Sequence, residues 1–424
     1  LIKTDYLFIP IRGARVDGHD FIPKVMSAGA LCTLSEKLLE GASYPYILVN
    51  SCEQALKDLA EYYRSSLDIK VVGITGSVGK TSTKEMIASV LEQKFNVLKT
   101  AGNYNNEIGL PLTIFNLRNE HEIAILEMGI SEFGEMTRLA KMARPDVCVI
   151  TNIGLCHLEF LKSRNGILKA KTEIFDYMQP GGAIILNGDD DMLATIGKTK
   201  GTMPCFFGLS TNHNCYATDI QSLGLKGTIC TIHFPEETLT VTIPIPGIHM
   251  VYNALAGACV GQALHLTPIE IKAGIECLKP VSGRNNIIET SEITVIDDCY
   301  NANPVSMKAS LDVLSNALGR KIAILGDMGE LGDNEKALHY EVGRYATHSG
   351  IDIIICIGTL AKEIANGAID TAGSSGTVSP CILHYNTKEL FLEASKSIIQ
   401  KNDTILIKAS HFMNFPVIVE ALVK

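Results

Sequence analysis

Apolar segments of strand length alternate with helical segments from Ile69 to the end of the chain, and this alternation constrains the fold most strongly. The segments IKVVGI, EIAILEM, DVCVITNI and GAIILN are almost continuously apolar, and stretches with helical periodicity separate them. Strands that are buried on both faces have this composition, and they occur in parallel sheets covered by helices. We therefore predict an α/β fold built on parallel sheets.

Changes in this pattern divide the chain into three predicted domains. Residues 1–67 predict a small mixed α/β domain with the strand YLFIPIRG, a turn and helix in DGHDFIPKVMSAGA, and helices over 34–40 and 51–65. Residues 68–282 predict a central parallel-sheet domain whose later, alternating segments (CYATDI, GTICTIHF and LTVTIPI) form an antiparallel appendage. Residues 283–424 return to strand–helix alternation and predict a Rossmann-like, doubly wound domain.

Bulk properties exclude several classes of function. The net charge of −9, with no long Lys/Arg run, excludes a nucleic-acid partner because the average field repels a polyanion. No apolar run reaches the roughly 18–20 residues of a membrane span, and no signal peptide opens the chain, so we expect no membrane insertion. The twelve cysteines form no C-x-x-C pair, which indicates free thiols in a reducing cytoplasm. The chain opens without Met just before a strand, so we expect part of the native N-terminus to be missing.

The segment VVGITGSVGKTSTKEM carries the strongest chemical signal. A buried strand ends at Ile74, Gly76 and Gly79 permit a tight turn, and Lys80 and Thr81 then open a helix. Such a loop directs backbone N–H groups and a helix N-terminus at a phosphate, and the Thr hydroxyl is placed to bind Mg²⁺. The segment departs from the strict G-x-x-x-x-G-K-[ST] template because Ile74 occupies the position of the first glycine. A strand, a glycine loop, Lys-Thr and a helix in one frame still predict nucleotide phosphate binding.

Three further side chains have a structural interpretation beside a catalytic one. Glu127 ends the strand EIAILEM, where it either faces a ligand crevice beside the phosphate loop or caps the next helix. His157 follows the next strand and is either a metal ligand at the same sheet edge or a structural hydrogen-bonding group. Lys171, in NGILKAKTEIF, is by spacing alone an ordinary solvated lysine on a helix.

Taken together, these segments resemble the Mur ligase family, and the resemblance covers essentially the whole chain. It is carried by the ordered series TGSVGKTSTKEM, GNYNNEIGLP, LEMG, NIGLCHLEF, KAKTEIF, LNGDDD, GIHMVYNALA and SGRNN. The resemblance implies an ATP-dependent ligase that forms an amide bond, in which a carboxylate takes the γ-phosphate of ATP and an amine displaces the resulting acyl phosphate. That chemistry relies on Mg²⁺ and Lys to stabilise dense negative charge rather than on a protein nucleophile.

The resemblance also implies which residues bind phosphate and metal. Thr81 would bind one Mg²⁺, and Glu127 and His157 would help to bind a second. Lys171 matches the carbamylated lysine of the family, in which bound CO₂ turns the amine into a carboxylate-like group, and Lys169 is the competing choice. The phosphates of ATP would contact Gly76, Ser77, Val78, Gly79, Lys80, Thr81 and Ser82.

The remaining nucleotide contacts and the UDP-linked substrate are assigned in the same way. Asn253 resembles the adenine contact, and Arg284 and Asp298 resemble the contribution of the C-terminal domain to the nucleotide when the domains close. The segment YLFIPIRGARVDGHDF resembles a domain that binds a UDP sugar, although a Ser-Arg pair expected before its strand is absent. Candidate substrate-binding residues are Asp17 and His19 in this segment, and Asn105 and Asn106 in GNYNNEIGLP.

The segments DDCYNANPVSM and ILGDMGELG resemble the family members that add D-alanyl-D-alanine to UDP-N-acetylmuramoyl-tripeptide in peptidoglycan precursor synthesis. We expect Tyr300, Asn301 and Asn303 to line the site of the incoming dipeptide. The alternative for these residues is an Asn/Pro-rich turn that caps a helix beginning at Pro304. A monomeric enzyme acting in the cytoplasm on these two substrates is the resulting expectation.

Three other functions compete with this interpretation. A ligase that adds the third muropeptide residue is disfavoured because the chain lacks a D-N-P-R-type motif, and a folate-type ligase is disfavoured by the UDP-binding segment. A phosphate-loop scaffold without catalysis stays open because the family's K-G-S-[RH]-x-M-x-x-E pattern appears as KASHFMNFP, with Ala409 and Pro416 as departures. The G-x-x-G-x-x-G spacing of ILGDMGELG lacks the close glycine pair that a nicotinamide cofactor requires.

Overall fold

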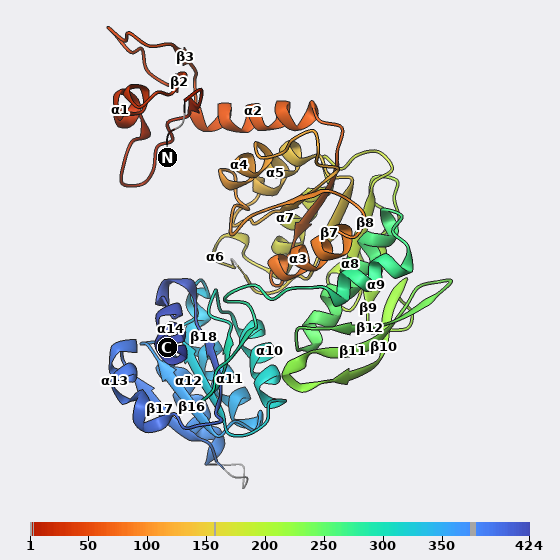
Figure 1. The fold of residues 1–424 in the computed structure, drawn as a ribbon, viewed down its shortest axis with the longest axis vertical. Coiled ribbons are helices and arrows are strands. Elements are labelled where there is room, and N and C mark those ends of the chain that lie inside the picture. The colour runs from red at the N-terminus through yellow and green to blue at the C-terminus, as the bar shows by residue number, and fades with distance from the viewer. Residues whose placement is uncertain (1, 3, 157, 374–378) are drawn as a thin grey trace.

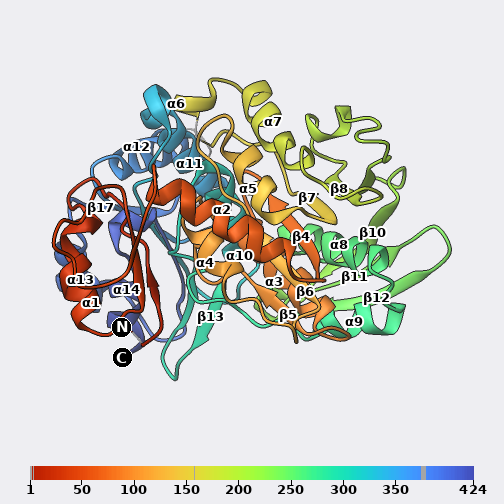
Figure 2. The same ribbon diagram turned by 90° about the horizontal axis from the view of Figure 1, so that it is seen from above.

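The computed structural model describes residues 2, 4–156, 158–373 and 379–424, and their strands form three separate sheets. The units built on these sheets follow one another along a bent path, with the middle unit between the other two (Figure 1). Both end units lie on the same side of the middle unit in the two perpendicular views (Figure 2). Among the described residues, no helix combines the length and apolar character needed to cross a bilayer.

The N-terminal unit is a small parallel sheet of three strands, β1 (Leu7–Phe8), β2 (Cys32–Ser35) and β3 (Tyr46–Leu48), in the order β1-β2-β3. A 3₁₀ turn, η1 (Gly18–Phe21), leads into the short helix α1 (Ile22–Ser27), as predicted. The helix α2 (Cys52–Ser65), capped by the Ser51 hydroxyl, then connects this unit to the middle unit.

The helix predicted over residues 34–40 is wrong, because this segment belongs to the end of β2 and an irregular stretch. Thr33, Leu34 and Ser35 are buried between β1 and β3, and the Ser35 hydroxyl bonds the backbone of Lys37 at both its N–H and its carbonyl. Pairing of Leu34 and Ser35 with β3, together with local side-chain bonds, overrides the helical spacing of the leucines. Leu38 is consequently 69 % exposed.

The middle unit contains a single nine-stranded sheet in the order β12-β11-β10-β9-β8-β7-β4-β6-β5. All pairs from β5 to β10 are parallel, and the pairs β10–β11 and β11–β12 are antiparallel, so the predicted appendage is a continuation of the main sheet. The strands are β4 (Lys70–Thr75), β5 (Val97–Lys99), β6 (Ile123–Glu127), β7 (Val147–Ile150), β8 (Ala183–Asn187), β9 (Cys205–Gly208), β10 (Cys215–Ser222), β11 (Thr228–His233) and β12 (Thr238–Ile243).

Helices cover both faces of this sheet, which explains why its central strands are apolar throughout. One face packs on α3 (Lys80–Leu91), α8 (Ile248–Ala263) and α9 (Pro268–Glu276). The other face packs on α4 (Gly109–Ile114), α5 (Glu135–Ala143) and α7 (Arg164–Thr172), with α6 (Leu158–Leu161) beside α7. Short 3₁₀ turns occur at η2 (Glu173–Phe175), η3 (Leu193–Thr195) and η4 (Gly224–Lys226).

The C-terminal unit is a six-stranded sheet in the order β13-β14-β18-β15-β16-β17, antiparallel only at the β13–β14 edge. Its strands are β13 (Asn286–Glu289), β14 (Thr294–Asp297), β15 (Lys321–Gly326), β16 (Ile353–Ile357), β17 (Cys381–Tyr385) and β18 (Thr404–Lys408). The helices α10 (Pro304–Ser315), α11 (Glu335–His348) and α12 (Ala361–Ala372) cover one face, and α13 (Lys388–Ile398) and α14 (Pro416–Val423) cover the other. The turns η5 (Gly332–Asn334) and η6 (His411–Met413) follow β15 and β18.

This strand order places the carboxyl ends of β14, β18 and β15 side by side. Helices that follow neighbouring strands on opposite faces leave a crevice at that edge, where ligands bind in open α/β sheets. The loops after these three strands therefore meet at one place, and this place faces the middle unit.

Candidate active site

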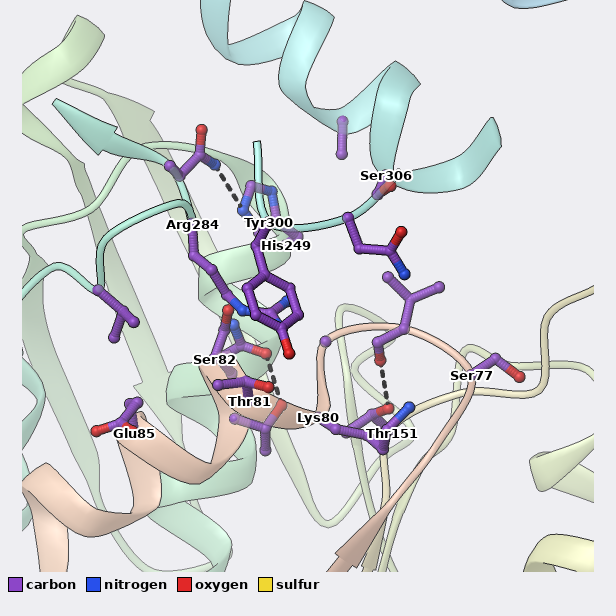
Figure 3. Close-up of a pocket in the computed structure, with 18 of the residues that line it drawn as sticks. Ser77, Lys80, Thr81, Ser82, Glu85, Thr151, His249, Arg284, Tyr300 and Ser306 are labelled. Atoms are coloured by element: carbon purple, nitrogen blue, oxygen red, sulfur yellow. Dashed lines mark hydrogen bonds between the residues drawn. The ribbon is translucent and has the colours of Figure 1, made fainter. Parts of the chain in front are cut away.

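A cavity of about 620 Å³ lies between the middle and C-terminal units. The phosphate loop and the first turn of α3, residues 77–83, form one wall, and the segment from Gly283 to Ser310 forms the opposite wall. Arg284 and Tyr300 extend from the C-terminal unit toward Thr81 and Ser82 (Figure 3). Residues of two units that are far apart in sequence thus surround one space.

The phosphate loop is held in shape by the neighbouring strand. β4 ends at Thr75, one residue beyond the predicted Ile74, and α3 begins at Lys80 as predicted. The backbone N–H of Val78 donates to the Asn152 side chain at 2.9 Å, and the Thr151 hydroxyl donates to the Val78 carbonyl at 2.7 Å. The Lys80 ammonium curls back to the carbonyl of Gly76 at 2.9 Å, within reach of an anion placed in the loop.

Gly76 is the position at which this loop tolerates no side chain. Its φ is +150°, and a Cβ atom would lie 1.9 Å from the Thr151 hydroxyl. We expect Gly76→Ala to destabilise the protein by about 1–3 kcal/mol and to weaken ADP binding, because the loop must move away from β7. Gly197→Ala, where a Cβ atom meets nothing within 4 Å, is the matched control. Melting and ADP titration check both variants, and equal behaviour of the two would contradict the prediction.

A buried carboxylate lies beside the loop. Glu127, at the end of β6, is 2 % exposed and accepts hydrogen bonds from the Thr81 hydroxyl at 3.0 Å and the Asn105 amide at 2.9 Å. Among the residues that the structure describes, no cationic side chain pairs with it. A buried carboxylate without a cation is costly, and a hydroxyl plus one carboxylate suits Mg²⁺, which completes its shell with phosphate oxygens and water. These residues therefore fit Mg²⁺, although no group of three or more His, Cys, Asp or Glu gathers within the described ranges.

Lys171 and Lys169 differ sharply in their surroundings. Lys171 is 1 % exposed in α7, whereas Lys169 is exposed to solvent. Burial, reinforced by the nearby charge of Lys80, lowers the pKa of Lys171 to about 7. The interpretation of Lys171 as a solvated helix lysine is therefore wrong, since the helix places this side chain in the core. His157, the other residue expected near the metal, lies outside the described residues.

The C-terminal wall is rich in polar contacts. The Arg284 guanidinium stacks on the Tyr300 ring at 4.1 Å from its centroid. The Asp298 carboxylate accepts hydrogen bonds from Lys408 at 2.6 Å and from the backbone N–H of Asn285 at 3.1 Å. Lys408 is 2 % exposed, so its ion pair with Asp298 is a buried anchor at the base of the wall.

Asn301 and Asn303 both line the cavity and both serve the local turn. The Asn303 side chain caps α10 in a capping box with Ser306, and the Asn301 side chain accepts from the next backbone N–H at 2.9 Å. The expected helix cap is confirmed for Asn303. This structural duty is compatible with a substrate contact, because an amide retains its N–H groups for a ligand.

Asn253 and Asn106 are the remaining predicted residues in the cavity wall. Asn253, in α8, accepts a hydrogen bond from the Thr83 hydroxyl at 2.8 Å. The Asn106 carboxamide oxygen accepts from the backbone N–H groups of Ile108 at 3.2 Å and Gly109 at 2.8 Å and so fixes the turn that leads into α4. Both side chains are thus positioned by neighbouring elements of the middle unit.

Asp17 and His19 do not line the cavity. His19 donates from Nδ1 to Asp17 at 2.7 Å and accepts the backbone N–H of Glu36 at Nε2, and Asp17 also pairs with Arg12. Both residues therefore stabilise the N-terminal unit around η1. The geometry does not bring them to the phosphate loop.

Sequence reasoning missed several residues of the cavity wall, among them Thr151, Asn152, His249 and Asn285. Thr151 and Asn152 directly follow β7, and the position of polar residues after a buried parallel strand was the signal that could have found them. Asn285 donates to His249 Nε2 at 3.1 Å across the two units, and burial lowers the pKa of that histidine. No local pattern in the sequence marks this pair.

Comparison with known proteins identifies the family. The model of the Mur ligase middle domain matches residues 74–261, and the model named "Mur ligase, glutamate ligase domain" matches residues 283–411. UDP-N-acetylmuramoyl-tripeptide–D-alanyl-D-alanine ligase of Bacillus subtilis is 39 % identical over 432 residues, which cover 100 % of this chain and 91 % of the relative. The chain belongs to the Mur ligase family. The predicted family resemblance is confirmed.

The ligase of the same name from Escherichia coli is 36 % identical and matches over 98 % of this chain and 90 % of its own length. A crystal structure of MurF from Acinetobacter baumannii superposes with a TM-score of 0.91 at 30 % identity, over 100 % of this chain and 92 % of the other. The MurF ligase of Thermotoga maritima in complex with ADP has a TM-score of 0.86 at 29 % identity, over 99 % and 94 %. The predicted three-domain α/β architecture of a Mur ligase is thus confirmed.

Proposed function

We propose that this Mur ligase joins D-alanyl-D-alanine to UDP-N-acetylmuramoyl-tripeptide with cleavage of ATP to ADP and phosphate. Relatives from several bacteria that match almost the whole chain are named for this reaction, and a relative of known structure binds ADP. The observation that carries the proposal is the single cavity, which combines the phosphate loop with Arg284, Asp298 and Tyr300 of the C-terminal unit.

The chemistry proceeds in two steps. The terminal carboxylate of the tripeptide attacks the γ-phosphorus, the bond to the bridging oxygen of ADP breaks, and an acyl phosphate forms. The amine of D-alanyl-D-alanine then attacks the acyl carbon, and phosphate leaves with the electron pair of the C–O bond. Lys80 and the loop from Gly76 to Ser82 hold the phosphates, so that the transferred group lies in line with its acceptor.

The metal assignments extend the same proposal. One Mg²⁺ would bind the Thr81 hydroxyl, and a second would bind near Glu127 and a carbamylated Lys171, with His157 as a further ligand. The ions supply charge stabilisation for the transferring phosphoryl group. Two observations support these assignments. The buried Glu127 carboxylate pairs with no cationic side chain among the described residues. Burial lowers the pKa of the Lys171 amine to about 7, and only a neutral amine reacts with CO₂.

The remaining assignments concern substrates and organisation. Asn253, Arg284 and Asp298 contact the nucleotide, and Tyr300, Asn301 and Asn303 face the dipeptide. Residues 1–67 bind the UDP end of the muropeptide, and Asp17 and His19 shape that site. Residues 68–282 bind ATP. Residues 283–424 bind the incoming dipeptide. Asn105 and Asn106, which line the cavity, contact the substrate. The enzyme acts as a monomer in the cytoplasm.

Phosphate release from ATP with defined substrates tests the reaction. We expect release only when UDP-N-acetylmuramoyl-tripeptide and D-alanyl-D-alanine are both present. Release with UDP-N-acetylmuramoyl-dipeptide and a free amino acid would assign the ligase that adds the third residue. Absence of release with either pair, in a protein that binds ATP, would overturn the ligase proposal.

A further inference from the structure

Glu107 lies at the centre of a three-way ion pair beside the cavity. Its carboxylate accepts from Lys57 of α2 at 2.8 Å and from Arg138 of α5 at 2.5 and 3.1 Å. The Glu107 side chain is 18 % exposed and that of Lys57 is 11 % exposed, so solvent screens these pairs only partly. The loop that carries Glu107, between β5 and α4, is thereby fastened to two helices.

The same loop reaches the candidate metal carboxylate. Two residues before Glu107, the Asn105 amide donates to Glu127 Oε1 at 2.9 Å, and the Asn105 carbonyl accepts the backbone N–H of Gly129 at 2.8 Å. The other oxygen of Glu127 accepts from Thr81 of the phosphate helix. The orientation of the Glu127 carboxylate therefore depends on where this loop lies.

We infer that Glu107 is a positioning residue, which anchors the loop between α2 and α5 so that Asn105 orients Glu127 for metal binding. This inference rests on the proposed function. Groups that hydrogen-bond a metal-binding carboxylate fix its geometry, and their loss typically costs 10–100-fold in metal affinity. Neutralising Glu107 would remove the shared partner of Lys57 and Arg138 and leave Lys57 paired with Glu53 of its own helix, so the loop would lose its attachment on both sides.

The position of α2 adds a consequence for the whole enzyme. This helix leads directly from the N-terminal unit, which is proposed to bind the muropeptide, into the middle unit. The ion pair between Lys57 and Glu107 links α2 to the loop that contacts Glu127. The ion pair between Lys57 and Glu107 therefore contributes both to the attachment of the N-terminal unit and to the geometry of the metal site.

Glu61 provides a matched control. It also has an 18 % exposed side chain and also joins α2 to α5, because it pairs with Lys141 at 3.1 Å and Arg144 at 2.8 Å. Within the part of the chain that the structure describes, Glu61 forms no hydrogen bond or ion pair with the loop that carries Asn105. Replacement of either carboxylate by an amide thus removes a comparable ion-pair cluster, but only one replacement affects the loop.

The test measures Mn²⁺ affinity of the ADP complex by electron paramagnetic resonance, with melting followed by circular dichroism. We expect Glu107→Gln to bind Mn²⁺ about tenfold more weakly than wild type. Glu61→Gln should change the affinity less than twofold while lowering the melting temperature by a similar amount. In an Asn105→Ala background, Glu107→Gln should produce no further loss of affinity, because both act through the same hydrogen bond.

The outcomes separate the inference from the function on which it rests. Equal Mn²⁺ affinities in wild type and Glu107→Gln, or equal losses in Glu107→Gln and Glu61→Gln, would overturn the inference alone. Additive losses in the double variant would show that Glu107 acts by another route and would overturn it as well. Failure of the wild-type ADP complex to bind Mn²⁺ would overturn the proposed metal site, and the inference with it.

Discussion

Lys80→Met should reduce ATP turnover on the order of 10³-fold while the protein keeps its fold. The Lys80 ammonium lies at the start of α3 and contacts only the carbonyl of Gly76 among the described residues, so its loss removes little structural stabilisation. In the transition state, by contrast, it faces the developing charge on the transferred phosphoryl group. Removal of one such pre-organised donor costs about 10²–10³ in kcat, and the loss of a full charge belongs at the upper end.

The measurement is steady-state phosphate release with both substrates, accompanied by thermal melting. Lys94→Met, just beyond the same helix, is the matched control because the Lys94 side chain is exposed, donates to the carbonyl of His265 and lies 5.4 Å from the centre of the Phe95 ring. Turnover of Lys80→Met within tenfold of wild type would contradict the assignment of this loop. A large fall in melting temperature would point to folding rather than catalysis.

Lys171→Met should abolish most turnover yet raise the melting temperature in buffer free of CO₂. The amine is buried and has no carboxylate partner among the described residues, so its protonated form is costly in the folded state. The pKa of Lys171 is about 7 in the folded protein and 10.5 in the unfolded chain. Below pH 7 both states are protonated and the penalty is complete. Between pH 7 and 10.5 the folded protein releases the proton, and the penalty shrinks as pH rises.

The stabilisation by Lys171→Met should therefore be constant below pH 7 and decrease toward alkaline pH. Bicarbonate should raise the melting temperature of the wild type but not of the variant, because only the lysine forms a carbamate. A carbamate resonance in the ¹³C spectrum after labelling with ¹³C-bicarbonate would identify that group directly. Lys169→Met, on the exposed face of the same helix, should behave as wild type in every assay. A carbamate signal that persists in Lys171→Met would show that a residue other than Lys171 carries the carbamate.

Much of the scaffold follows from local patterns. The apolar strands of the two large sheets, the phosphate loop from Gly76 to Thr81, and the cap at Asn303 all rest on residues within a few positions of one another. Period-two and period-3.6 spacing, turn chemistry and helix capping act over such distances, so the sequence alone predicts them. The error at residues 34–40 arose where pairing with β3 overrode the spacing of the leucines.

The sequence by itself determined the fold class, the phosphate loop and the family, because each is encoded in short, ordered segments. Only the tertiary structure decided that Lys171 is buried while Lys169 is exposed, that Lys408 anchors Asp298, and that Glu107 joins two helices to the Asn105 loop. The ion pairs of Lys408 and Glu107 join residues that are 31 to 110 positions apart in sequence. Burial and charge pairing over such separations depend on how the sheets and helices pack, and no local spacing encodes that packing.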